Sequence, residues 1–390
     1  MISVSEALDQ VFALVSPLAT ETVPLTSANG RTLSKDVFAK RDQPPFAASA
    51  MDGYAIKSVE ADPQAMFKVV GESAAGHGFA GILKAGQAVR IFTGAPLPEG
   101  ADRVIIQEDV DRKGNLITLH NEVDSAHYIR PAGADFKCGD KISAPRILTP
   151  NDIALLASMN IADVPVTRRP VVALIATGDE LVMPGETPGP DQIIASNNFG
   201  LKALFEDHGA EARLIPIARD NVPSLQTAFS LCEDVDLIVT IGGASVGDHD
   251  LVAQVAAEMG LEQSFYKVAM RPGKPLMAGH LNGTPMIGLP GNPVSSMVCG
   301  HVFIIPALRH LLGFKAEPRH QRRAFLTTDL PKNGGREHYM RSRVEHDKIT
   351  PFQRQDSALL TVLADANALL IQEIDQSEQA AGTEVSYIPL

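Results

Sequence analysis

Cysteine is scarce in this chain of 390 residues, which contains only Cys138, Cys232 and Cys299, far apart in the sequence. An odd number of cysteines at such spacing fits neither a disulfide scaffold nor a zinc-binding motif. Proteins with so few cysteines are typical of reducing compartments. We therefore expect a cytoplasmic location.

Basic residues are outnumbered, with 34 Lys and Arg against 46 Asp and Glu and a formal net charge of −12. Sequence-independent binding to nucleic acids requires a basic face. The one local basic run, Arg319 to Arg323, is better explained as a solvated linker. The composition therefore predicts no nucleic-acid partner.

Long apolar runs are also missing, because no stretch approaches the ~18 apolar residues of a membrane span. The N-terminus, MISVSEALDQ, lacks the basic segment followed by an apolar one that marks a signal peptide. Apolar residues nevertheless make up 45% of the chain, as in ordinary globular proteins. We expect a globular protein of about two to four domains without a membrane segment.

Between residues 171 and 312, the sequence contains short apolar runs that alternate with helical patterns. Val171–Ala176 and Leu237–Ile241 have the apolar composition of strands covered on both faces. Ala212–Ile217 and Thr284–Gly288 are two further predicted strands. The helical patterns begin near Ser196, Pro223, Leu251 and Pro293. This alternation predicts a three-layer α/β domain with a mostly parallel sheet.

The loop after Leu237–Ile241 runs Gly242-Gly243-Ala244-Ser245-Val246-Gly247-Asp248-His249-Asp250. Its glycines would let backbone N–H groups approach an anion closely. Asp248 and Asp250 would repel a bare phosphate, but they suit a Mg²⁺ ion held between them and the phosphate. In the alternative interpretation, the two carboxylates cap the next helix and the glycines form a tight turn.

Polar residues follow the other strands as well. Asp179 and Glu180 follow the first strand, and Asp220 follows the second. Val268–Met270, which we interpret as a further strand, leads into Arg271-Pro272-Gly273-Lys274-Pro275. Because ligands of open α/β sheets bind beyond the carboxyl ends of the strands, four groups together predict a site for a phosphorylated ligand with Mg²⁺. They are Asp179/Glu180, Asp248/Asp250, Arg271/Lys274 and the loop around Asn292.

The last of these loops is Pro290-Gly291-Asn292-Pro293-Val294-Ser295-Ser296. Asn292 suits the N-cap and Pro293 the first position of a helix that continues to about Leu312. Free N–H groups beside the hydroxyls of Ser295 and Ser296 would form an anion site. A well-capped buried helix would explain Asn292 and Pro293 equally well.

The rest of the chain carries mainly structural signals. Ser3 and Glu6 form a capping box before a helix, and residues 149–168 predict a second helix. Residues 67–142 alternate short β-type runs with glycine turns, which predicts a mostly β domain. Residues 320–390 predict a small β domain or barrel with a short helix at 357–366.

Six stretches, in this order, resemble the MoeA family, the molybdopterin molybdenumtransferases that include the gephyrin E domain. They are PPFAASAMDGYA at 44–55, TGAPLPEGADRVI at 93–105, ATGDEL at 176–181, GGASVGDHD at 242–250, RPGKP at 271–275 and GLPGNPVSS at 288–296. The resemblance implies four domains: a helical linking subdomain (1–45 and 146–170), an inserted mostly-β domain (46–145), an α/β molybdopterin-binding domain (171–312) and a C-terminal β barrel (317–390). It also implies a homodimer whose active site lies between the α/β domain of one chain and the β domain of the other.

The activity implied by the resemblance is insertion of molybdate into adenylylated molybdopterin. The phosphoanhydride is hydrolysed, AMP and molybdenum cofactor leave, and Mg²⁺ is the expected cofactor. The resemblance also suggests a molybdopterin adenylyltransferase and molybdoenzyme apoproteins as partners. The sequence does not distinguish molybdate from tungstate, since the two oxyanions are nearly equal in size and charge.

Matching positions in the family imply roles for individual residues. Asp52 and Thr93 would reach the site from the partner chain. Glu180, Asp220 and Asp250 would hold Mg²⁺ or activate water, and Lys274, with Arg271, would hold phosphate or molybdate. Pro290 and Pro293 would shape the adjacent loop. The remaining implied ligand contacts are Gly242, Gly243, Ser245, Gly247, Asp248, Gly291, Asn292 and Ser295, with Arg341 and Ser357 from the C-terminal domain.

Two positions depart from the family pattern. Ala134 stands where the family usually carries Glu, and Arg271 stands where Lys is usual. Arg binds phosphate as a planar fork, whereas Lys acts as a point charge. These changes leave open a paralogue with altered efficiency or metal preference. Two other functions compete with the transferase: a molybdopterin adenylyltransferase that uses ATP, and a non-catalytic molybdopterin-binding scaffold.

Overall fold

The computed structural model describes residues 1–243 and 251–390. The chain divides into two compact units, which we describe separately. The larger unit comprises residues 1–21, 30–34 and 166–390, and the smaller unit comprises residues 22–29 and 35–165.

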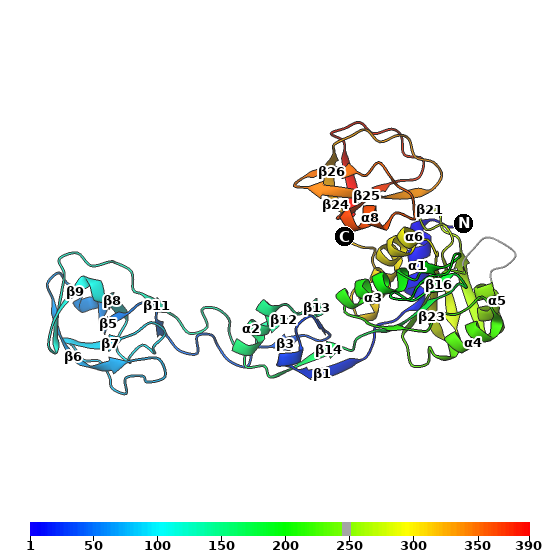
Figure 1. Ribbon diagram of the computed structural model, residues 1–390. Helices are drawn as coiled ribbons and strands as arrows, with labels where there is room; N and C mark the ends of the chain where they lie inside the picture. Colours follow the sequence, from blue (N-terminus) through cyan, green and yellow to red (C-terminus); the bar gives the residue numbers. More distant parts are fainter. Residues whose placement is uncertain (244–250) are drawn as a thin grey trace. The chain divides into compact units, whose positions relative to one another are not determined.

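A six-stranded sheet forms the centre of the larger unit (Figure 1). Strands β18, β15, β19 and β23 run parallel, and β22 and β20 join antiparallel at one edge. The prediction of a mostly parallel sheet is confirmed. The antiparallel edge was missed because the run of β22 is interrupted by Gly279 and His280, and β20 is largely exposed. In sheet order the strands are β18 (Glu211–Leu214), β15 (Val171–Ala176), β19 (Leu237–Ile241), β23 (Thr284–Leu289), β22 (Met277–Leu281) and β20 (Leu261–Tyr266).

Alternate residues of β15 face opposite layers of helices. Val172 and Leu174 belong to a core with one set of helices, whereas Ala173 and Ile175 belong to a core with another set. This alternation is the two-residue period of a strand, and it explains why the sequence of β15 is apolar throughout. The first set is α1 (Val4–Leu14), α3 (Asn197–Asp207), α6 (Pro293–Cys299) and α7 (Ile305–Leu311), and the second is α4 (Val222–Ser230) and α5 (Leu251–Glu258).

Helix α1 has the predicted capping box, in which Ser3 and Glu6 exchange hydrogen bonds. Val4, Leu8 and Val11 pack into the core of the α/β sheet. The first helix is therefore part of the α/β layers, which corrects its assignment to a linking subdomain of residues 1–45.

Helices α6 and α7 are joined by a π-helical turn, Gly300–Ile304, into one helix from Pro293 to Leu311. This helix has 19 residues and a mean hydropathy of 1.3, so it is long and apolar enough to cross a membrane. No such segment was predicted from the sequence. Because 83% of its apolar stretch is buried within the protein, it is a core helix.

The C-terminal strands form a closed ring in the order β25, β26, β24, β28 and β27, with β27 pairing back to β25. The predicted barrel is confirmed, and α8 (Leu360–Asp365) is the predicted short helix. Strand β21 (Met270–Arg271) pairs with β25 of the barrel, which corrects its expected place among the α/β strands. The ring strands are β24 (Arg322–Leu326), β25 (Glu337–Glu345), β26 (Lys348–Pro351), β27 (Ala368–Gln372) and β28 (Glu384–Pro389).

The smaller unit contains a second six-stranded sheet, which confirms the mostly β prediction. Tyr54, Phe67 and Ile105 lie in its core. Two short ladders accompany it, β4 (Ala48–Ser49) with β11 (Ile129–Arg130) and β3 (Val37–Phe38) with β12 (Lys141–Ile142). In order, the sheet contains β8 (Arg103–Ile106), β5 (Gly53–Ile56), β7 (Gln87–Ile91), β6 (Met66–Ser73), β10 (Leu116–Leu119) and β9 (Val110–Lys113).

Helix α2 (Pro150–Ser158) has Thr149 as its N-cap and is shorter than the predicted helix of residues 149–168. Asn160 has a φ of 63°, the left-handed backbone that ends helices, and strand β14 (Asp163–Thr167) follows. The division between a linking subdomain and an inserted domain stays a prediction. The remaining strands are β1 (Thr20–Pro24), β2 (Thr32–Leu33), β13 (Arg146–Ile147), β16 (Leu181–Val182) and β17 (Ile193–Ile194).

Candidate functional site

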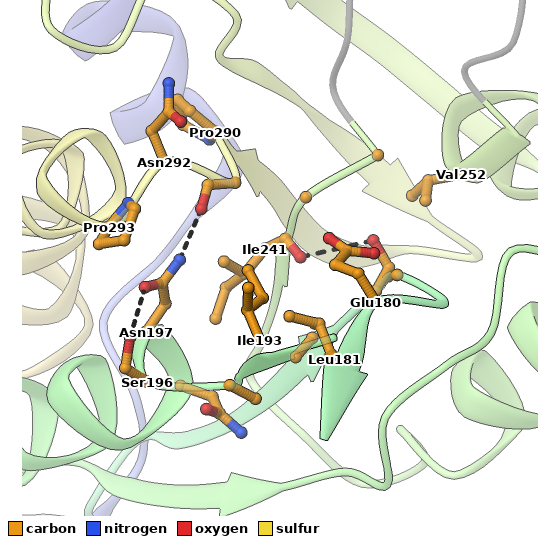
Figure 2. Close-up of a pocket in the computed structure, with 18 of the residues that line it drawn as sticks. Glu180, Leu181, Ile193, Ser196, Asn197, Ile241, Val252, Pro290, Asn292 and Pro293 are labelled. Carbon is orange, nitrogen blue, oxygen red and sulfur yellow. Dashed lines mark hydrogen bonds between the residues drawn. The ribbon is translucent and has the colours of Figure 1, made fainter. Parts of the chain in front are cut away.

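A cavity of about 1000 Å³ lies beyond the carboxyl ends of β15, β19 and β23 in the larger unit (Figure 2). The carboxyl ends of parallel strands share one edge of the sheet, so loops far apart in sequence meet there. The lining includes Thr177, Gly178, Glu180, Asp220, Gly242, Gly243, Pro290, Gly291, Asn292 and Pro293. The predicted meeting of the acidic loop, the glycine loop and the Asn292 loop is confirmed.

Glu180 and Asp220 supply exposed carboxylates to this cavity from two different loops. The carboxylate of Glu180 folds over Gly178, where an added Cβ would lie 2.3 Å from Glu180 Oε2. Asp179, predicted together with Glu180, instead accepts a hydrogen bond from the Asp220 backbone N–H at 3.1 Å through its Oδ1. The acidic part of the cavity therefore comes from Glu180 and Asp220.

The two carboxylates allow a direct test of the expected Mg²⁺ site. Mg²⁺ is usually held by one or two carboxylates together with substrate phosphate oxygens, rather than by a cage made only of protein. Within residues 1–243 and 251–390, no group of three or more metal-ligating side chains occurs. Glu180 and Asp220 on one cavity therefore fit a Mg²⁺ ion that is shared with a phosphorylated ligand. Asp250, the third predicted ligand, lies outside the described residues.

The backbone conformation and the close packing of their loop require glycine at positions 242 and 243. Their φ values are 95° and 66°. A Cβ on Gly242 would lie 2.8 Å from Thr177 O, and one on Gly243 would lie 2.1 Å from Val252 Cγ2. A tight turn and close packing thus account for both glycines without a ligand. Ser245, Gly247 and Asp248, also predicted here, lie outside the described residues.

The Asn292 loop begins helix α6, with Asn292 at the N-cap and Pro293 in the first turn, as predicted. Asn292 does not cap with its side chain. Instead, Asn197 donates from Nδ2 to Gly291 O at 2.7 Å, which holds this loop to the start of α3 (Figure 2). Asn197 and its neighbour Ser196 line the cavity. Their sequence pattern predicted only a helix start.

The hydroxyls predicted for an anion site beside Asn292 do not face the cavity. Ser295 and Ser296 are buried, and Ser296 donates from its Oγ to Pro293 O at 2.9 Å. Helical periodicity places these residues on the core side of α6. The prediction that Ser295 contacts a ligand is therefore wrong for its side chain in this structure.

Neither Arg271 nor Lys274 lines the cavity. Pro275 lines the cavity, and Lys274 beside it is exposed. Arg271 donates from Nη2 to Asn333 Oδ1 at 3.1 Å on the barrel side. Burial lowers the pKa of the Arg271 guanidinium, with the positive charge of Arg336 contributing further.

Arg341 is fully buried in the barrel and does not reach the cavity. Its guanidinium donates to Gln355 Oε1 and to Asp356 O, both at 3.0 Å. These bonds order the segment that carries Ser357, whose carbonyl accepts from the N–H of Val294 in α6 at 3.0 Å. Arg341 therefore supports this segment instead of contacting a ligand. Ser357 precedes Ala358, which lines the cavity, so its predicted ligand contact stays a prediction.

Asp52 and Thr93 come together in the smaller unit. Asp52 Oδ1 accepts hydrogen bonds from the N–H and the Oγ1 of Thr93, both at 2.7 Å. The backbone N–H of Thr93, followed by its hydroxyl, holds the pKa of Asp52 below its usual range. The arrival of these residues from a partner chain stays a prediction.

The cavity also has an apolar wall that the sequence analysis did not assign. Leu181, Ile193 and Ile194 of the short β16–β17 ladder contribute to it, together with Ile241 and Val252. Ile193 is 58% exposed. Isolated surface apolar residues are common but clustered ones mark binding surfaces, and the sequence alone did not show that these residues would be exposed together.

Comparisons with known proteins cover nearly the whole chain. Residues 2–160 match the MoeA N-terminal region (domain I and II), residues 173–310 match a probable molybdopterin binding domain, and residues 323–390 match the MoeA C-terminal region (domain IV).

Individual relatives agree with this assignment. Molybdopterin molybdenumtransferase 2 of Mycobacterium tuberculosis is 36% identical over 380 residues, which cover 93% of each chain. Molybdopterin molybdenumtransferase of Haemophilus influenzae is 34% identical and covers 99% of this chain and 96% of its own. The crystal structure of a molybdopterin biosynthesis MoeA protein from Pyrococcus horikoshii OT3 covers 100% of both chains, with 27% identity and a TM-score of 0.85. The chain belongs to the MoeA family.

Proposed function

We propose that this protein is a Mg²⁺-dependent molybdopterin molybdenumtransferase that inserts molybdate into adenylylated molybdopterin. One observation carries the proposal: in a domain of the MoeA family, one cavity combines two carboxylates with a glycine turn and a helix start. Paired carboxylates and N–H groups beside each other suit a ligand that has both phosphate and a bound divalent cation.

The reaction ends with hydrolysis of the phosphoanhydride. The oxygen of water bonds to one phosphorus, the bridging oxygen leaves with its electron pair on the other, and AMP departs. When bound, Mg²⁺ would neutralise the charge that develops on the leaving phosphate. Glu180 and Asp220 would hold that ion or accept a proton from the water. The backbone at the start of α6 would face the anion, and the wall around Ile193 would limit the entry of bulk water.

Further contacts belong to the same proposal. Lys274, which precedes the cavity-lining Pro275, would hold molybdate or phosphate together with Arg271. Asp52 and Thr93 would complete the site from the second chain of a homodimer. A molybdopterin adenylyltransferase and molybdoenzyme apoproteins are the proposed partners that supply the substrate and receive the product. The cytoplasmic location is supported by the three cysteines, all of which are described and free.

The test is release of AMP from adenylylated molybdopterin by the full-length protein with Mg²⁺, with and without molybdate. We expect AMP release that depends on molybdate, together with active molybdenum cofactor. Titration with tungstate then measures oxyanion selectivity. Binding of the substrate without AMP release would overturn the enzymatic proposal and support a scaffold, whereas consumption of ATP with molybdopterin would support an adenylyltransferase.

A further inference from the structure

Arg219, in the loop between β18 and α4, binds the turn that carries Glu180. Its Nη1 donates to three main-chain carbonyls of that turn, Gly178 O at 3.4 Å, Asp179 O at 3.1 Å and Leu181 O at 3.0 Å. These carbonyls flank Glu180 on both sides. Converging carbonyl dipoles repel one another, so a cation among them stabilises the turn.

Two further hydrogen bonds join the same two loops. The N–H of Asp220 donates to Asp179 Oδ1 at 3.1 Å, and in the opposite direction the N–H of Gly178 donates to Ala218 O at 3.0 Å. Arg219 is itself anchored, because its N–H donates to Ser224 Oγ at 2.9 Å at the start of α4. The turn and the loop therefore form one bonded unit.

The two carboxylates that face the cavity take no part in this bonding. Within the described residues, neither the carboxylate of Glu180 nor that of Asp220 has a hydrogen-bond or ion-pair partner. Their positions depend on the backbone that Arg219 and Asp179 hold. Two carboxylates on one cavity also repel each other, and the positive charge of Arg219 reduces that repulsion.

We propose that Arg219, assisted by Asp179, is a positioning residue that holds Glu180 and Asp220 ready for a divalent cation. This inference rests on the proposed function only for the assignment of these two carboxylates as Mg²⁺ ligands. Residues that orient metal ligands commonly change metal affinity or activity by about 10- to 100-fold when they are replaced.

Replacing Arg219 changes the affinity for a metal ion in opposite directions, depending on whether Arg219 acts by positioning the carboxylates or only through its charge. Removing a positive charge near an acidic pair would by itself strengthen the binding of a cation. Loss of positioning would weaken it, because the carboxylates would no longer be held for the same ion. Weaker binding in a variant that lacks the Arg219 charge is therefore the specific signature of positioning.

The experiment titrates full-length protein with Mn²⁺, alone and with saturating AMP, and measures free Mn²⁺ by electron paramagnetic resonance. We expect the Kd of Arg219→Gln to rise by about tenfold or more. Arg213→Gln is the matched control, since Arg213 lies on β18 and pairs only with the exposed carboxylate of Glu211 at 2.9 Å among described partners. That control should change the Kd by less than about twofold.

A Kd of Arg219→Gln that equals or falls below that of Arg213→Gln would overturn the inference. If Arg219→Gln does not fold, Asp179→Ala and Asp179→Asn decide the question, because both remove the same charge and only Asn keeps the acceptor for Asp220 N–H. We expect weaker Mn²⁺ binding in the Ala variant than in the Asn variant, and equal binding would contradict the proposal.

Failure of the inference and failure of the proposed function give different results. If the wild type releases AMP and Arg219→Gln matches it in both assays, only the inference fails. If the wild type releases no AMP, the function fails and the Mn²⁺ comparison still decides the role of Arg219. A wild type that binds Mn²⁺ in neither condition would overturn the inference directly.

Discussion

Carboxylates occupy two contrasting settings in this molecule. In the smaller unit, Asp52 is held by the N–H and the hydroxyl of Thr93. In the larger unit, the carboxylates of Glu180 and Asp220 face a cavity without a hydrogen-bond or ion-pair partner among the described residues. The difference teaches that Asp52 is already hydrogen-bonded within its own unit, whereas Glu180 and Asp220 are available to a ligand.

The largest expected effect comes from removing an available carboxylate. Glu180→Gln or Asp220→Asn keeps the size of the side chain but removes its charge, and we expect molybdate-dependent AMP release to fall by about 100-fold or more. Single-turnover assays with Mg²⁺ measure this. Asp179→Asn is the control, because Asp179 does not line the cavity and the substitution keeps its acceptor oxygen. Equal losses in all three variants would remove the distinction between available and structural carboxylates.

A smaller effect should follow from moving Glu180 without changing its charge. In Gly178→Ala, the added Cβ would lie 2.3 Å from Glu180 Oε2, so the carboxylate must shift. We expect AMP release to fall by about tenfold or more, since small displacements of reacting groups are costly.

Gly185→Ala provides the matched control for that substitution. Gly185 lies on the same connection and also has a positive φ, of 94°, but a Cβ there would meet nothing within 4 Å. Gly185→Ala therefore introduces the same kind of backbone strain as Gly178→Ala but does not displace Glu180. Equal activity of the two variants would show that the exact place of Glu180 does not matter.

The smallest expected effect concerns the bonded carboxylate. Thr93→Val removes one of the two donors to Asp52 and leaves the backbone N–H, so the pKa of Asp52 should rise only part of the way to its ordinary value. The pKa of Asp52 is lower in the folded protein than in the unfolded chain. Ionised Asp52 therefore stabilises the fold fully at pH values above its pKa in the unfolded chain, and this stabilisation is lost as the pH falls through its pKa in the folded protein. NMR titration of the Asp52 carboxyl carbon measures the change. An unaltered pKa would mean that the hydroxyl does not hold this carboxylate.

Much of the larger unit could be predicted because its strands are covered on both faces. Val171–Ala176 and Leu237–Ile241 coincide with β15 and β19, since burial on two sides demands a continuous apolar run. Pairing partners were less predictable. Val268–Met270 has a strand composition, but composition does not show that Met270–Arg271 pairs with the barrel strand β25.

The site was predictable where topology alone decides it. Loops that follow parallel strands meet at one edge, so Glu180 and Asn292 were placed together correctly, whereas Asp220 was assigned to the site only through the family resemblance. The direction of single side chains depends on packing between distant elements, so Ser295 and Arg341 were expected in contact with ligand and are buried instead. Arg219 was overlooked because a charged residue in a loop resembles an ordinary solvent-exposed one in the sequence.

The shared packing of barrel and α/β sheet limits how this protein can be divided. Tyr339, Leu369 and Ile371 of the barrel belong to the same hydrophobic core as Val268 and Met270. A recombinant fragment that stops at residue 312 would expose that apolar surface and leave β21 without its partner strand. Such a fragment is a poor reagent for ligand screening or crystallisation, because open strand edges and exposed apolar faces promote aggregation.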